Sequence, residues 1–145
     1  MKLESPAFEN HKPIPKRFAH DEGDLSPPLV FRDLPRGTQS LVLIMDDPDA
    51  PMGTFDHWIA WNISPETKTL QEGAPLDHQG KNGYKKLGYG GPFPPPGYPH
   101  RYFFKAYALD IELELSEGSI KKQVEQAMEG HILGQAELIG TYENF

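Results

Sequence analysis

Apolar residues occur along the chain in short runs separated by turn-forming residues, a pattern typical of a succession of β-strands. We predict strands at Leu3–Phe8, Leu29–Phe31, Ser40–Met45, His57–Ile63, Arg101–Leu109, Glu112–Leu115 and Ile132–Tyr142. Trp58 and Trp61 fall on opposite faces of one of these strands, which indicates that both faces are covered.

One segment has helical periodicity instead. Apolar residues recur at helical spacing from Ile120 to Met128, Ser116 is a candidate N-cap, and Gly130 stands where a helix commonly ends. We therefore expect one peripheral helix near residues 117–129. Strands separated by turns, with a single late helix, favour a mostly β fold with antiparallel pairing.

The length of 145 residues predicts a single domain spanning 1–145. Acidic residues outnumber basic ones by 21 to 14, and the net charge of −7 argues against nucleic acid and anionic membranes as partners. The longest apolar run, Leu41–Met45, is too short to cross a bilayer, and the N-terminus has no apolar signal-peptide core. We expect a cytoplasmic protein without integral membrane contact.

Residues 64–100 form a long segment rich in glycine, proline and polar residues. Loops of this length within a compact domain are usually functional or disordered, and the aromatic residues Tyr84, Tyr89, Phe93 and Tyr98 favour order. The stretch from Gly90 to Gly97 has too few free N–H groups to cradle a phosphate. We expect it to form a rigid wall.

Candidate chemistry begins where the strand at 40–45 ends. Asp47 and Asp49 alternate there with Pro48 and Pro51, whose fixed φ angles stiffen the turn and orient both carboxylates. Two interpretations remain open: a functional pair of acids, or an Asx-type turn in which the aspartates bind backbone N–H groups.

Histidines stand at the heads of two other predicted strands. His57 follows the Asp47 turn by a short loop, and His100 shares one strand face with Tyr102. Imidazole and phenol together form a donor site for phosphate or carboxylate oxygens, with the carboxylate of Asp47 holding one histidine. The alternative is purely structural, with edge histidines bonded to loops and a core tyrosine.

Several familiar functional motifs are missing from the sequence. The segment after Asp47 lacks EF-hand spacing, neither His-Glu-x-x-His nor Gly-x-Ser-x-Gly occurs, and the chain has no cysteine. We therefore expect no metal and no cofactor. Acyl transfer lacks an obvious nucleophile, which favours a non-catalytic protein.

Three segments, Asp47–Pro51, His57–Asn62 and Gly90–Phe104, stand in an order and spacing that resembles the phosphatidylethanolamine-binding protein family, also called Raf kinase inhibitor protein-like. The resemblance is to its short prokaryotic members and extends from Ser26 to Tyr142. It implies a large antiparallel sheet packed on a smaller one.

The same resemblance implies a small anion-accepting pocket at strand ends. Carried over position by position, the pocket is lined by Asp47, His57, His100 and Tyr102, with Asp49 and Pro92 beside them.

The chain departs from the pattern in one loop. Phe93 replaces the cysteine common in prokaryotic relatives, and Tyr98-Pro99 is an addition. We expect both changes to narrow the mouth of the pocket.

Our leading functional expectation is a binding or regulatory protein whose pocket takes a small anionic, phosphate-bearing ligand. One alternative is a protein inhibitor or scaffold of a protease or kinase. Another is a hydrolase or isomerase that uses His57 and His100. The resemblance also makes a homodimer a plausible assembly.

Overall fold

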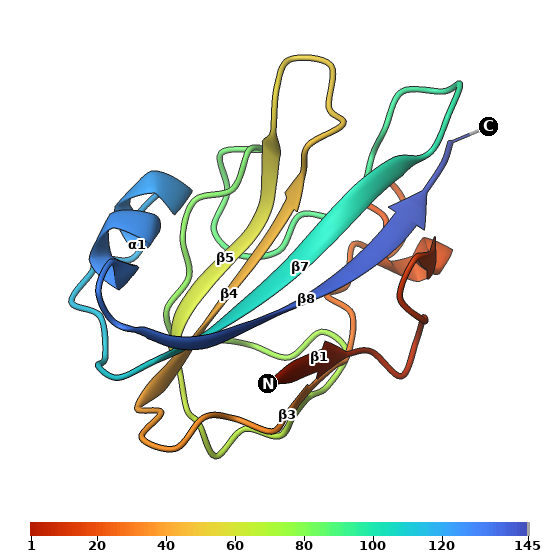
Figure 1. Ribbon diagram of the computed structural model, residues 1–145. Helices are drawn as coiled ribbons and strands as arrows, with labels where there is room; N and C mark the ends of the chain where they lie inside the picture. The colour runs from red at the N-terminus through yellow and green to blue at the C-terminus, as the bar shows by residue number, and fades with distance from the viewer. Residues whose placement is uncertain (145) are drawn as a thin grey trace.

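The computed structural model describes residues 1–144 and contains two β-sheets (Figure 1). The larger sheet has the strand order β2 (Lys12–Pro13), β8 (Ile132–Tyr142), β7 (His100–Leu109), β4 (Ser40–Asp47) and β5 (Phe55–Ile63). The smaller sheet has the order β1 (Lys2–Glu4), β3 (Leu29–Arg32) and β6 (Thr69–Leu70). All pairings are antiparallel except that of β2 with β8. The predicted fold class is confirmed.

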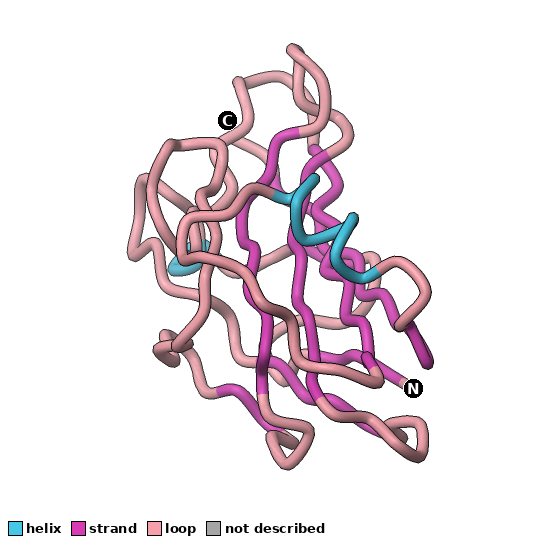
Figure 2. The backbone as a smooth tube through the Cα atoms, turned by 90° about the vertical axis from the view of Figure 1, so that its left-hand side faces the viewer, coloured by secondary structure: helices cyan, strands magenta, loops and turns pink. Residues whose placement is uncertain are grey.

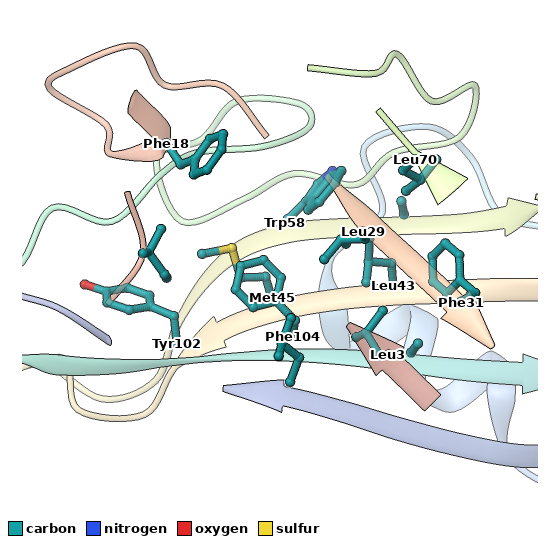
Figure 3. Close-up of a cluster of buried hydrophobic side chains, with 14 of the residues drawn as sticks. Leu3, Phe18, Leu29, Phe31, Leu43, Met45, Trp58, Leu70, Tyr102 and Phe104 are labelled. Carbon is teal, nitrogen blue, oxygen red and sulfur yellow. The ribbon is translucent and has the colours of Figure 1, made fainter. Parts of the chain in front are cut away.

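The main core lies between the two sheets. Leu29 and Phe31 of β3 belong to the same buried cluster as Leu43, Trp58 and Phe104 of the larger sheet (Figure 3). Burying such a side chain stabilises the fold by about 1.5–3 kcal/mol. The contact therefore fixes the smaller sheet against one face of the larger one.

A second cluster covers the opposite face of the larger sheet. Val124 and Met128 of helix α1 (Lys121–Met128) pack there with Val42, Ile59 and Trp61. The short 3-10 helix η1 (Lys16–Phe18) contributes Phe18 to the main core, and the two helical segments lie apart (Figure 2). Because both faces are covered, every residue of β4 is buried, as its apolar run predicted.

A bulge in β5 accounts for two differences from the sequence prediction: the face on which Ile63 lies, and the absence of a strand at 112–115. Asn62 has φ 51°, and beyond it Ile63 joins the main core, whereas Trp61 lies in the second cluster. The Asn62 side chain donates to Leu113 O (2.8 Å) and accepts from Leu113 N–H (2.7 Å). The predicted strand at 112–115 is therefore wrong, because a side-chain amide holds this segment in place of a β-ladder.

The helix is shorter than predicted, and Ser116 is not its cap. Gly118 has φ 88°, which right-handed helix cannot accommodate, so the helix begins only at Lys121. The side chain of Gln123 accepts from Ile120 N–H at 2.9 Å at the actual start. Gly130 has φ 80° after the last turn, which agrees with its predicted role as the terminator.

The first strand ends at Glu4 and not at Phe8 as predicted. Ser5 Oγ donates to Pro28 O at 2.7 Å and accepts from Ala7 N–H at 3.1 Å, so a side-chain turn replaces the ladder. Among residues 1–144, no helix is long and apolar enough to span a bilayer.

Candidate functional site

The candidate site is a cavity of about 210 Å³ at the end of β4 and at the starts of β5 and β7. The loop between β4 and β5 and the loop leading into β7 extend beyond this same end of the sheet (Figure 1). The cavity is lined by Asp47, Ala50, Pro51, Phe55, His57, Tyr84, Phe93, Pro94, Pro95, His100 and Tyr102. Four of the six site residues predicted from the sequence are therefore brought together here.

The floor contains a buried pair of Asp47 and His100. His100 Nδ1 lies 2.7 Å from Asp47 Oδ2, and both side chains are at most 4% exposed. The other carboxylate oxygen accepts the Asp49 backbone N–H at 2.8 Å. Asp47 therefore forms the Asx-type turn, and its second oxygen fixes a histidine ring. The histidine that it holds is His100 and not His57.

His57 is held by the wall segment instead. Its Nδ1–H donates to Gly90 O at 2.7 Å, and a carbonyl oxygen can only accept. Nε2 of the neutral ring therefore carries a lone pair and acts as an acceptor. Burial lowers the pKa of His57, against the opposing effects of the Gly90 carbonyl and the Asp47 carboxylate. The ring is consequently neutral at physiological pH.

Tyr102 contributes a hydroxyl that is buried without a hydrogen-bond partner among residues 1–144. Figure 3 shows its oxygen pointing away from the apolar cluster. Its ring lies edge-on to the ring of His57, with the ring centroids 5.2 Å apart. Burial raises the pKa of Tyr102, with smaller contributions from Asp47 and Tyr84. The phenol therefore stays protonated and is available as a donor.

Aromatic side chains form the walls. The ring of Tyr84 packs against Phe55 (4.8 Å) and stacks on His20 (4.1 Å), and its hydroxyl donates to Gly91 O at 2.7 Å. Phe93 lines the cavity and is exposed at its mouth. Tyr98 does not line the cavity, although its ring lies 5.6 Å from that of His100.

Sequence reasoning missed Phe55 and Tyr84 as site residues. Phe55 pairs with Asp47 across the β4–β5 ladder, a position that depends on the exact register of the hairpin. Tyr84 comes from the long loop, where its aromatic character indicated order and gave no direction. Neither position had a signal in the sequence beyond residue type.

Asp49 and Pro92, the other two predicted residues, lie outside the cavity lining. Asp49 accepts two bonds from the Arg101 guanidinium, each 2.9 Å long, which lowers the pKa of its carboxyl to about 2. Pro92 O accepts His20 N–H at 2.9 Å. Both residues therefore fix the surrounding loops, while Asp47 alone brings a carboxylate to the floor.

Other polar clusters are less suited to binding a ligand. Behind the same end of β4, Asp46 is 3.2 Å from the amines of both Lys105 and Lys121, and Lys121 also binds Asp56 at 2.8 Å. These charges satisfy one another. A larger hollow of about 560 Å³ between β1 and β8 contains no histidine. No group of three His, Asp or Glu residues within 1–144 is placed to hold a metal ion.

Comparisons with known proteins identify a family and several relatives. The model of the phosphatidylethanolamine-binding protein family matches residues 4–143. A UPF0098 protein of Chlamydia trachomatis is 48% identical over 149 residues, covering 99% of both chains. A UPF0098 protein of Pyrococcus horikoshii is 46% identical, covering 96% of this chain and 75% of its own.

Solved structures give the same result. A crystal structure described as a phosphatidylethanolamine-binding protein homologue of C. trachomatis superposes with a TM-score of 0.95 at 47% identity, covering 99% of this chain and 97% of that one. YbcL of Escherichia coli, described as a member of the mammalian PEBP family, gives 0.92 at 25% identity, covering 99% and 98%. With the family model matching nearly the whole length, the chain belongs to the phosphatidylethanolamine-binding protein family, in its short prokaryotic branch.

Proposed function

We propose that the cavity binds a small anionic, phosphate-bearing ligand without catalysing a reaction on it. The observation that carries the proposal is the Tyr102 hydroxyl, a donor that lines the cavity and is buried without a hydrogen-bond partner within residues 1–144. An unpaired buried polar group costs about 1–3 kcal/mol. A ligand oxygen that accepts from Tyr102 removes that cost when it binds.

The size of the cavity supports a small ligand. About 210 Å³ lies below the roughly 300–1,000 Å³ of pockets that hold drug-sized molecules. Polar groups at the floor and apolar side chains at the mouth fit a compact acid group whose substituent points outward. The family's name refers to a lipid that contains a phosphate group, and phosphate is the part of that lipid that we propose the cavity recognises.

The lining also favours binding over group transfer. It contains no Ser, Thr, Cys or Lys, so the described walls supply no hydroxyl or amine nucleophile of the usual kind. Asp47 is the one carboxylate among the described lining residues. It already uses both oxygens in hydrogen bonds to His100 and to the Asp49 backbone. These features support a receptor that holds its ligand unchanged.

Isothermal titration with inorganic phosphate tests the proposal. We expect binding to the wild-type protein and an affinity about fivefold to tenfold lower for Tyr102→Phe, because one hydrogen bond is lost. Tyr107→Phe is the matched control, since Tyr107 lies on the same strand but packs against the second cluster. An absence of binding in the wild-type protein, or equal losses in both variants, would contradict the proposal.

A further inference from the structure

We infer that the cavity selects an acid group that still carries a proton, so that it accepts inorganic phosphate and protonated phosphomonoesters and rejects phosphodiesters and sulfate. The inference rests on the proposed function and adds the protonation state and ester class of the ligand. The inference is based on the lining of the cavity, where a hydrogen-bond acceptor lies next to a hydrogen-bond donor.

His57 supplies the acceptor. Its Nδ1–H is committed to Gly90 O at 2.7 Å, so the opposite ring nitrogen carries the lone pair. The ring lies edge-on to Tyr102, with centroids 5.2 Å apart, so both side chains meet one small ligand. An acid that binds here must therefore accept from one side chain and donate to the other.

His100 does not change this balance. Its Nδ1 is engaged with Asp47 Oδ2 at 2.7 Å. In the neutral ring its Nε2 is a second acceptor, and in the protonated ring it is a donor. Either form leaves His57 Nε2 as an acceptor that the ligand has to satisfy.

A fully ionised oxygen against the His57 lone pair is unfavourable, because two acceptors then face each other away from water. A P–O–H group donates to Nε2 and removes the conflict. Inorganic phosphate keeps such a proton at neutral pH, and a phosphomonoester keeps it below about pH 6. A phosphodiester and sulfate have no such proton, so the diester headgroup of an intact phospholipid lacks the required donor.

Protonating His57 would also remove the conflict at Nε2, but its surroundings oppose the charged ring. The titratable groups around the ring are Asp47, Asp56, Tyr84, His100 and Tyr102. The two carboxylates favour the charged ring, but burial outweighs them and the pKa of His57 stays below 6.5. At neutral pH the proton must therefore come from the ligand.

Four probes separate these possibilities by isothermal titration: inorganic phosphate, methyl phosphate, dimethyl phosphate and sulfate. We expect dimethyl phosphate and sulfate to bind at least about tenfold more weakly than inorganic phosphate, since each leaves a buried acceptor unpaired. Methyl phosphate should bind at about pH 5.5 and weaken about tenfold by about pH 8, while inorganic phosphate changes less. Dimethyl phosphate represents a lipid headgroup, and methyl phosphate a monoester.

Two variants complete the test. His57→Gln places an amide NH₂ donor near the position of Nε2, so sulfate should then bind within about threefold of phosphate. Tyr102→Phe should weaken every probe without changing their ratios. Should His57→Gln fail to fold, the wild-type ratios decide alone. Equal affinity of the wild-type protein for sulfate and phosphate overturns this inference and leaves the proposed function standing, whereas no binding of any probe overturns both.

Discussion

Replacing Tyr102 by phenylalanine should stabilise the ligand-free protein while weakening its response to phosphate. The Tyr102 side chain is fully buried, and its hydroxyl has no partner among the described residues. Removing that oxygen relieves the desolvation cost and leaves the ring in the core. A residue kept for folding alone would show the opposite effect, because truncation of a well-satisfied side chain costs stability.

The expected magnitude follows from the isolation of the hydroxyl. An unpaired buried hydroxyl costs about 1–3 kcal/mol, and deleting one oxygen forfeits a few van der Waals contacts. The net gain for Tyr102→Phe is then about 1 kcal/mol, or roughly 3 °C in Tm for a chain of this length. Phosphate at a hundred times its Kd should stabilise the wild-type protein by about 2.7 kcal/mol. The variant should lose roughly half of that stabilisation at the same phosphate concentration, since its affinity falls about tenfold.

Urea unfolding with and without phosphate measures both effects in one experiment. The variant should be the more stable protein without phosphate, and the difference should shrink or reverse in its presence. Tyr107→Phe is again the control, with no gain in phosphate-free buffer. The Tyr102 hydroxyl is not an unpaired ligand donor if Tyr102→Phe lowers the free energy of unfolding without phosphate by about 1 kcal/mol or more, or if the variant keeps the full stabilisation by phosphate.

Three further predictions concern the framework of the site. Asn62→Ala should lower the free energy of unfolding in urea by about 3 kcal/mol, because it removes two hydrogen bonds to Leu113 and puts alanine at φ 51°. Asn62→Gly should lower it by about 1 kcal/mol less, because glycine adopts this φ without strain. Equal losses would show that the backbone conformation contributes nothing. The lowered pKa of His57 means that the unfolded chain binds a proton that the folded chain refuses, so stability should fall as pH drops below about 6.5. His57→Gln should flatten that part of the profile, and an unchanged slope would exclude His57 as its source. Gly91→Ala should lower the free energy of unfolding by about 1–3 kcal/mol and weaken phosphate binding, because a β-carbon there collides with Phe18 O. Wild-type behaviour in both assays would show that the segment around Gly91 is not a rigid wall of the cavity.

Much of the fold was readable because its signals are local. The ends of β8 match the predicted strand at both residues, and β4 and β7 extend the predicted runs by one or two residues. A continuous apolar run predicts a strand buried on both faces, and the structure supplies a separate cluster for each face of β4. Such patterns depend on residue type and spacing, which a single sequence contains.

The errors came from contacts between distant parts of the chain. The segment around Leu113 looks like a strand by composition, but the amide of Asn62, 51 positions earlier, binds its backbone groups. Gly118 interrupts the predicted helix through a positive φ that composition does not reveal. Such contacts exist only in three dimensions.

The candidate site, too, was predicted only in part from the sequence. Asp47, His57, His100 and Tyr102 meet at one cavity, as strand-end positions and the family motifs predicted. Period-two geometry placed His100 and Tyr102 on one face, but it gave no hydrogen-bond partners. Loop packing decides these partners. Asp47 binds His100, Gly90 O accepts from Nδ1–H of His57, and Asp49 binds Arg101.

A crystal structure of this protein with inorganic phosphate would show whether the cavity is the phosphate-binding site. We expect phosphate in the cavity, with one oxygen about 2.7 Å from Tyr102 Oη and another within about 3 Å of His57 Nε2. The same crystals in sulfate should leave the cavity to water. Phosphate bound only at surface lysines or arginines, with the cavity filled by water in both crystals, would show that the cavity is not the phosphate-binding site.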